Sequence, residues 1–180
     1  MLTNRQTLYR TKRGQLLRKT REHYLRNDID CGILGCTLCK PFAHSSVKLD
    51  PPLPVFVPDT NAVLDGIDFF ESEYVKNIIF LQTVLQETRY RSSSIYDRVR
   101  SITQNPDKRA IVFSNEFHQD VYIERSMNES VNDRNDRAIR TAVLWYMGHG
   151  SNLNFFMITK DQQNSIFSLE KNISVLTRIS

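Results

Sequence analysis

The sequence predicts an α/β fold, a three-layer α/β/α sandwich around a mostly parallel sheet. Two observations favour it: from Val55 onward short apolar runs alternate with longer segments of helical periodicity, and 180 residues with 40% hydrophobic content suit one domain with a sizeable core. The segment before Val55 differs, because it is basic and carries all three cysteines. We therefore expect an N-terminal extension over residues 1–54 and an α/β domain over 55–180.

The extension contains two kinds of segment. Apolar and basic residues flank Gly14 in residues 8–18, which predicts two short strands around a glycine turn. Residues 31–54 hold two glycines and four prolines, so we expect a loop that something other than regular structure holds in place.

The α/β domain opens with an apolar run at Val55, and comparable runs predict the later strands. The expected strands are 55–58, 78–81, 110–113, 155–159 and 173–176. Segments with apolar residues at helical spacing predict helices at 60–72, 83–91, 94–104, 115–125 and 131–148. The last helix has the clearest apolar stripe, and Gly148 and Gly150 favour its termination there.

Four acidic residues follow strands or lie in the first turns of helices. Asp59 comes directly after the run at 55–58, Asp161 comes one residue beyond the run at 155–159, and Glu87 and Asp136 lie on expected helices. Open α/β sheets place their sites outside the carboxyl ends of the strands. Clustered carboxylates repel one another unless a cation is present. The pattern therefore predicts a site for Mg²⁺ or Mn²⁺, which prefer oxygen ligands.

Each acid also has a plainer interpretation. Asp59 could cap a helix, Glu87 could be a solvated helix residue, Asp136 could pair with Arg140, and Asp161 could lie in a turn. Exposed acids are common, so any one of them alone favours the plainer interpretation. The joint placement at strand ends favours the metal site.

The three cysteines, Cys31, Cys36 and Cys39, fall within nine residues. An odd and closely spaced set favours a metal site over a disulfide framework. Structural Zn²⁺ takes four ligands in a tetrahedron, so a fourth is needed. His44 is the local candidate and His149, at the end of the long helix, is the distant one. Three reduced cysteines without a metal are the alternative.

Four motifs together resemble one family closely. They are Pro58-Asp59-Thr60-Asn61, the segment 81–89, the segment 132–140 and Ile158-Thr159-Lys160-Asp161. In combination they are similar to the N-terminal PIN nuclease domain of the catalytic subunit of the eukaryotic RNA exosome, over nearly the whole chain. The larger downstream part of that subunit is an RNase II-like exonuclease. We therefore expect this chain to be a piece of a longer protein.

The resemblance implies that Asp59, Glu87, Asp136 and Asp161 are catalytic and bind Mn²⁺ or Mg²⁺. It implies endonucleolytic cleavage of single-stranded RNA that leaves a 5′-phosphate. Two divalent cations about 4 Å apart would activate a water and stabilise the leaving oxygen. Asn61 and Thr159 are candidate supporting residues that orient a water near the metal. One departure is Lys160, which stands where the family often has Asn before the last acid. The acid itself is kept, so activity is still expected, and the effect of Lys160 on substrate contact or metal affinity is left open.

For zinc, the resemblance favours His149 over His44. Helix geometry places His149 roughly 20 Å from Asp136, so this zinc site would be structural and remote from catalysis. The cysteine loop would then pin the N-terminal segment to the domain near His149, far from the acids.

Net charge is +4, and basic residues concentrate near the N-terminus. Residues 1–26 hold a single acid, Glu22, against Arg5, Arg10, Lys12, Arg13, Arg18, Lys19, Arg21 and Arg26. Such a segment favours contact with RNA or with a protein partner, and a solvated strand pair is the alternative. The resemblance favours docking onto the exosome ring subunits, and it implies location in the nucleus and nucleolus and also in the cytoplasm.

The sequence has no apolar run of the length that a bilayer needs and no apolar core of a signal peptide, so we expect no membrane partner. A scaffold that docks the exonuclease without cutting RNA is the alternative function. Four intact acids favour the enzyme.

Overall fold

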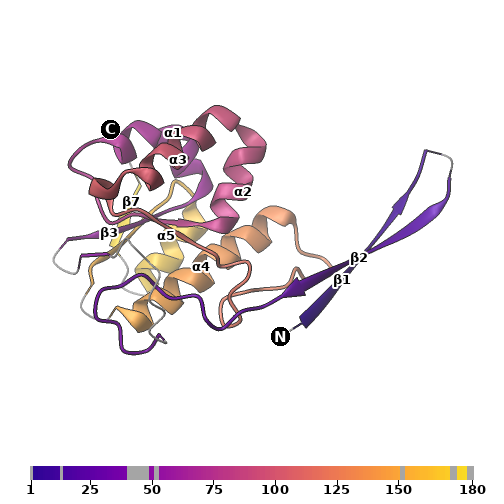
Figure 1. Cartoon of the computed structure of the whole chain (residues 1–180). Coiled ribbons are helices and arrows are strands. Elements are labelled where there is room, and N and C mark those ends of the chain that lie inside the picture. Colours follow the sequence, from indigo (N-terminus) through magenta and orange to yellow (C-terminus); the bar gives the residue numbers. More distant parts are fainter. Residues whose placement is uncertain are drawn as a thin grey trace.

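A computed structural model describes residues 2–12, 14–39, 49–50, 53–150, 153–170 and 174–177, without the side chains of 2–9, 17–22, 163, 168 and 169. Figure 1 shows an α/β body from which an N-terminal β-hairpin extends. The expected fold class is confirmed, because every strand pair of the body is parallel and helices connect the strands.

The strands of the body form two parallel ladders. One ladder has the order β3-β6-β7 and the other pairs β4 with β5. A parallel bridge between Phe56 and Ile78 joins the ladders, which gives the order β5-β4-β3-β6-β7. The strands are β3 (Val55–Pro58), β4 (Ile79–Leu81), β5 (Ile111–Phe113), β6 (Phe155–Ile158) and β7 (Ser174–Leu176). Each lies within a residue or two of its predicted range.

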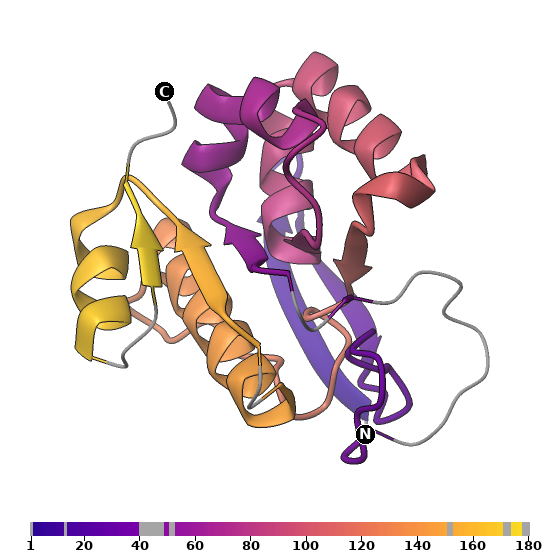
Figure 2. The same ribbon diagram turned by 90° about the vertical axis from the view of Figure 1, so that its left-hand side faces the viewer.

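Helices lie on both sides of these strands. In Figure 1, α1, α2 and α3 lie above the strands and α4 and α5 lie below them. Figure 2 shows the same two groups after a quarter turn. The helices are α1 (Thr60–Glu71), α2 (Gln82–Arg91), α3 (Ser93–Gln104), α4 (Val131–His149) and α5 (Gln162–Glu170), with a 3₁₀ turn, η1, at Pro106–Lys108.

The core is apolar and lies between the strands and both groups of helices. All three residues of β4 are buried, as are Val57 of β3 and Met157 of β6. Strands covered on both faces read as continuous apolar runs, which is why the sequence located them well. The stripe of α4 that the sequence predicted is buried too: Ala138, Ile139, Ala142, Val143 and Tyr146. Each fully buried large side chain contributes about 1.5–3 kcal/mol by leaving water.

Two helix predictions were wrong. Residues 115–125 do not form a helix, because their main chain pairs elsewhere: Phe117 accepts a hydrogen bond from the amide of Arg26, and Gln119 donates one back to the Arg26 carbonyl. No local pattern indicates this contact, which joins segments about 90 residues apart. Conversely, α5 was not predicted, because Gln162–Glu170 lacks a clear apolar stripe.

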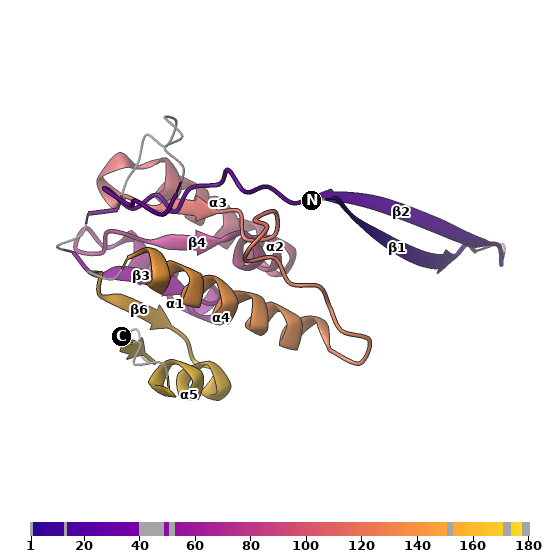
Figure 3. The same ribbon diagram turned by 90° about the horizontal axis from the view of Figure 1, so that it is seen from below.

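The hairpin consists of β1 (Leu2–Arg10) and β2 (Leu16–Tyr24), and it is longer than the sequence predicted. The strands pair antiparallel, from Leu2 opposite Tyr24 to Arg10 opposite Leu16. Gly14 lies in the turn with φ of +80°, a conformation that favours glycine. Figure 3 shows that the hairpin extends well beyond the body.

The described parts of the loop at residues 31–54, which we call the linker, contact the body. Ile33 forms a parallel bridge with Leu49, and the buried side chain of Asn77 bonds both the amide and the carbonyl of Asp50. Arg109 adds an ion pair with Asp50. Residues 40–48, which include the candidate ligand His44, lie outside the described residues.

Candidate active site and metal centres

The structure brings the four singled-out acids to one polar cleft of about 520 Å³. Asp59 follows β3 and Asp161 lies just beyond β6, the neighbouring parallel strand, so the two meet at the carboxyl edge of the sheet. Glu87 reaches the cleft from α2 and Asp136 from α4. The cleft is also lined by Thr60, Asn61, Arg91, Asn132 and Asp133.

Asp59 is the most enclosed of the four acids, with 3% of its surface exposed. One carboxylate oxygen caps α1 by accepting from the amide of Ala62 at 2.7 Å. The other oxygen accepts from the hydroxyl of Thr159. The same hydroxyl accepts from the amide of Asp161 at 3.0 Å, so Thr159 orients two of the acids at once.

Glu87 is held by residues from two other helices. Its Oε2 accepts from the hydroxyl of Thr60 at 3.0 Å and from the amide nitrogen of Asn135 at 3.2 Å. Its Oε1 lies 3.7 Å from a guanidinium nitrogen of Arg91, one helical turn along α2. The same arginine donates to the side chain of Asn61 at 2.9 Å, which fixes this supporting candidate at the rim.

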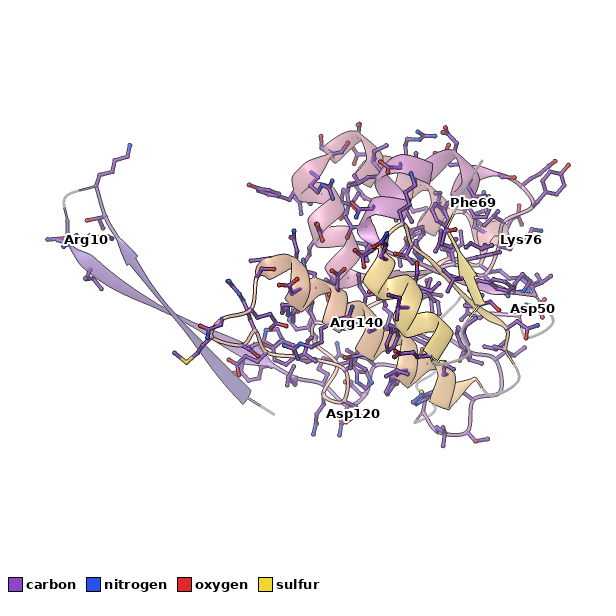
Figure 4. All side chains as sticks on the ribbon, turned by 180° about the vertical axis from the view of Figure 1, so that it is seen from behind. Arg10, Asp50, Phe69, Lys76, Asp120 and Arg140 are labelled. Atoms are coloured by element: carbon purple, nitrogen blue, oxygen red, sulfur yellow. The ribbon has the colours of Figure 1, made fainter. Side chains whose placement is uncertain are left out.

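Asp136 and Asp161 share a partner that sequence reasoning missed. The fully buried Asn164 donates its side-chain amide to Asp136 Oδ1 at 3.3 Å and its backbone amide to Asp161 Oδ1 at 2.9 Å. Its own side-chain oxygen accepts from Arg140 at 2.9 Å, and Figure 4 shows Arg140 between α4 and α5. An acid just before a helix signals a cap by Asp161, but the side-chain contacts of Asn164 depend on how α4 and α5 pack, which the sequence does not display.

Burial and mutual repulsion act on these acids. Burial raises the pKa of Asp59, the charge of Asp161 adds to the rise, and hydrogen bonds from Thr159 and Ala62 oppose it. Burial is also the largest cause that raises the pKa of Asp136, with repulsion from Asp161 and Asp59, while Asn164 and Arg140 favour the charged form. The fold thus holds Asp59 and Asp136 where ionisation is costly, a feature common at functional sites.

The donor set suits hard divalent cations. The cleft presents carboxylates and side-chain amide and hydroxyl oxygens, which are the ligands that Mg²⁺ and Mn²⁺ prefer. Within the described residues, no three of these carboxylates converge as tightly as the cysteines described below. A two-metal site does not need three acids on one ion, because two ions about 4 Å apart divide the carboxylates between them. The role of the four acids as ligands stays a prediction.

Two other residues near the acids have separate partners. Lys160 donates to Asp65 on α1 at 3.0 Å, which holds the ammonium group on the surface; it is not among the residues that line the cleft. Asp133 does line the cleft, but it pairs with Ser130, whose hydroxyl caps α4.

A second candidate centre is formed by Cys31, Cys36 and Cys39, whose sulfur atoms all lie within 4.8 Å of one another. Burial strongly raises the pKa of Cys31. Burial acts the same way on Cys36, yet amide groups of Cys39 and Leu38 and the neighbouring thiols lower its pKa overall. Three converging sulfurs fit a metal such as zinc, which selects soft ligands.

His149 stands beside this cluster. It lines a cavity of about 150 Å³ together with Cys39, Trp145 and His118. Its Nδ1 is 2.9 Å from the carbonyl oxygen of Trp145, so the ring can donate there and present Nε2 as a ligand, an arrangement common among metal-binding histidines. α4 runs unbroken from Val131 to His149, which puts this centre and the acid cleft at opposite ends of one helix.

The hairpin contacts a different part of the body from the cysteine loop. At its base, His23 stacks between Phe117 and Tyr122 at centroid distances of 4.9 and 4.7 Å. The neighbouring Glu116 forms an ion pair with Arg134 in the first turns of α4. The expectation that the cysteines hold the whole extension far from the acids is therefore wrong for the hairpin, which leaves the body near the acid end of α4 (Figure 3).

Comparisons with known proteins agree on one family. The model of the PIN domain family matches residues 56–178. The human protein "Exosome complex exonuclease RRP44" is 40% identical over 98% of this chain, and the Arabidopsis thaliana "Exosome complex exonuclease RRP44 homolog A" is 38% identical over 93%. The chain spans only 20% and 18% of the length of these two relatives.

The structure also resembles a solved domain. The PIN domain of RRP44 from T. brucei superposes with a TM-score of 0.74 and 29% identity, covering 85% of this chain and 88% of that one. Among the described helices, none combines the length and apolar character needed to cross a membrane.

Proposed function

Because the chain belongs to the PIN domain family, whose members are typically nucleases, we propose that it is a metal-dependent endoribonuclease domain. The substrate would be single-stranded RNA, and the whole protein would be the catalytic subunit of an RNA exosome; its relatives are named exosome complex exonucleases. The observation that carries the proposal is the convergence of Asp59, Glu87, Asp136 and Asp161 on one cleft from four separate elements.

Asp59, Glu87, Asp136 and Asp161 would hold Mn²⁺ or Mg²⁺. Such ions supply Lewis-acid stabilisation of phosphoryl oxygens and a water that is a nucleophile at neutral pH. The chain's own contribution is to fix the carboxylates. Thr159 and the amide of Ala62 hold Asp59, Asn164 holds Asp136 and Asp161, and Thr60 and Asn135 hold Glu87.

Positive charge at the rim suits the phosphodiester backbone. Arg91 lines the cleft and is about half exposed, although it lies near Glu87 and Asn61. A guanidinium in this position can bind a phosphate oxygen of the RNA strand and orient the scissile bond.

The second proposed role is to tether the exonuclease to the exosome ring. β1 and β2 form a sheet of two strands, and an edge strand of this kind can pair with a strand of another protein. A structural zinc held by Cys31, Cys36, Cys39 and His149 would tie the loop that follows the hairpin to the C-terminal end of α4. Location in the nucleus, the nucleolus and the cytoplasm belongs to the same proposal.

Cleavage of a circular single-stranded RNA tests the nuclease proposal, because an exonuclease has no end to attack on a circle. We expect linear products with Mn²⁺ and none when EDTA is present. The Asp136→Asn variant, with an unchanged circular dichroism spectrum, should not cut. If the wild-type domain binds the exosome ring but leaves the circle intact with Mn²⁺ or Mg²⁺, the domain is a scaffold and the nuclease proposal is wrong.

A further inference from the structure

A second cavity of about 320 Å³ lies directly beside the acid cleft. The two share Glu87, and Asn135, which lines the second cavity, donates to that carboxylate at 3.2 Å. Its walls come from α2, from the segment 116–125 and from the start of α4, through Thr83, Gln86, Glu87, Tyr90, Glu116, Tyr122, Ile123, Arg125, Val131, Arg134 and Asn135. We call it the tyrosine pocket, after Tyr90 and Tyr122.

One wall of the tyrosine pocket is rigid. Arg134 makes two hydrogen bonds to Glu116, at 2.5 and 2.8 Å, and another to the carbonyl of Ile123 at 2.7 Å. Glu116 also accepts from the hydroxyl of Thr83. The Tyr122 ring carries His23 stacked at 4.7 Å and the Arg134 guanidinium at 5.8 Å. The wall is thus formed before any ligand arrives, which lowers the entropic cost of binding.

The charges in this wall cancel. Burial opposes ionisation of Glu116, yet Arg134 and Thr83 lower its pKa overall, so the carboxylate is charged and neutralises Arg134. The whole lining holds two arginines, Arg125 and Arg134, against two glutamates, Glu87 and Glu116, so the pocket has no excess of positive charge that would bind a phosphate. A neutral planar group suits it better, and its volume lies at the lower end of the usual range for small-molecule sites, roughly 300–1,000 Å³.

The opposite rim is formed by Tyr90, which is 92% exposed. Tyr90 lies three residues after Glu87 on α2, so the two side chains occupy the same face of the helix, about 4.5 Å apart along its axis. Facing water is unfavourable for the apolar surface of such a ring, and stacking on a base is favourable. Gln86 and Arg125, also in the lining, carry groups that can hydrogen-bond to the edge of a base.

We propose that the tyrosine pocket is a nucleobase subsite, which takes one unpaired base of the RNA strand next to the phosphodiester held at the acid cleft. Tyr90 stacks on this base, and the wall of Tyr122 and Arg134 limits its depth. A base in a duplex is stacked and paired, and cannot enter without leaving the helix. The subsite thus gives a physical reason for a preference for single strands. It rests on the proposed function, since it assigns the RNA path from the acid cleft.

The test uses a uridine oligomer in which one position carries 2-aminopurine, a base whose fluorescence falls when it stacks. Binding is measured in EDTA, so that no cleavage is required, with the substituted position moved along the strand. We expect one position to be quenched by the wild-type protein and by Tyr90→Phe, which keeps the ring. Tyr90→Ala should lose this quenching and bind the oligomer about tenfold more weakly, as for the loss of one stacked base. Tyr74→Ala is the matched control, because Tyr74 is 87% exposed and is not part of the pocket lining.

A second strand has an abasic ribose at the quenched position. If the pocket holds that base, wild type and Tyr90→Ala bind this strand equally. The subsite is overturned if Tyr90→Ala quenches and binds like Tyr74→Ala, or if Tyr90→Ala weakens binding of the abasic strand as much as that of the intact one. Cleavage of circular RNA is scored separately. Position-specific quenching without cleavage supports the subsite and contradicts the nuclease proposal, whereas cleavage without quenching does the reverse.

Discussion

The two ends of α4 carry opposite kinds of candidate metal centre. At its N-terminal end, Asp136 joins an open cleft of about 520 Å³ whose donors are oxygen atoms spread over four elements. At its C-terminal end, His149 shares a cavity with Cys39, one of three cysteines whose sulfurs lie within 4.8 Å of one another. Oxygen donors select hard cations and thiolates select soft ones. An open site leaves room for substrate, whereas four protein ligands close a structural one.

The comparison teaches that one helix can support two candidate metal centres, because the oxygen donors and the sulfur donors lie at opposite ends of it. If the account is right, each centre can be removed without the other. The expected changes below run from the largest effect to the smallest.

Removing the charge of Asp136 should have the largest effect. Asp136→Asn keeps the shape of the side chain but lacks the anion that attracts a divalent cation. We expect the rate of circular RNA cleavage to fall by more than about 100-fold, the upper end of what outer partners of metal sites usually cost. Zinc content should not change. Asp133→Asn is the matched control, since Asp133 lines the same cleft but pairs with Ser130; equal losses in both variants would contradict the assignment.

Removing the cysteines should have the opposite pattern of effects, with loss of zinc and a smaller loss of RNA cleavage. Elemental analysis of the wild-type domain should find about one zinc per chain, and the Cys36→Ser, Cys39→Ser double variant should have none, because thiolates supply the binding free energy. We expect weaker binding to the exosome ring in pull-downs and a smaller loss of RNA cleavage. If ring binding persists while cleavage collapses, the cysteine loop belongs to the active site.

His149→Ala and His44→Ala identify the fourth zinc ligand. His149→Ala should lose zinc and His44→Ala should retain it, since His149 lines the cavity that also contains Cys39. The reverse result would move the ligand to the linker and would separate the zinc centre from α4.

Asn164 tests whether the acids depend on their positioning partner. Asn164→Ala removes the side-chain donor to Asp136 and the acceptor of Arg140. We expect the Mn²⁺ concentration for half-maximal cleavage to rise about 10–100-fold, with recovery of much of the rate at saturating Mn²⁺. The neighbouring exposed Gln162→Ala should behave like wild type. A loss of rate that no Mn²⁺ concentration restores would indicate a role other than placing the carboxylates.

Much of this architecture was predictable from sequence. The apolar runs located the strands, because a parallel sheet covered on both faces shows as continuous hydrophobic stretches. Asp59 and Asp161 were found because acids just after two such runs meet at one sheet edge. The apolar stripe expected on the last helix does face the core, and Tyr146 is fully buried there.

The remainder depended on contacts that the sequence does not display. The amide of Arg26 and the carbonyl of Phe117 pair across the fold, and this pairing replaces the helix expected at 115–125. Asn164 and Asn135 could not be identified as partners of the acids until the helices were placed. The direction of the hairpin depends on the stacking of His23 on Tyr122, which no local pattern encodes.

Asp136→Asn should also have a smaller effect, on the thermal stability of the metal-free domain. A carboxyl group whose pKa is raised on folding stabilises the folded state when protonated, and this stabilisation is lost as pH rises through the folded pKa. The pKa of Asp136 is raised, by burial first and then by Asp161. Asp136→Asn should therefore melt a few degrees above wild type at pH 7 in EDTA. The difference should disappear below the ordinary carboxyl pKa; a gap that is constant with pH would contradict this cause.

Lys160 should have the smallest effect. Its ion pair with Asp65 joins two side chains that are about half exposed, and such pairs contribute about 0–1 kcal/mol. We expect Lys160→Asn to change the melting temperature and the Mn²⁺ dependence of cleavage very little. A large shift in the Mn²⁺ dependence would show that Lys160 acts on the cleft.

The most direct test of the contrast between the two ends is a crystal structure of the Mn²⁺-soaked domain, with diffraction recorded at both the manganese and the zinc absorption edges. The account predicts anomalous peaks for manganese among Asp59, Glu87, Asp136 and Asp161, and a single zinc peak among Cys31, Cys36, Cys39 and His149. Manganese at the sulfur cluster, or no manganese at the carboxylates, would contradict it.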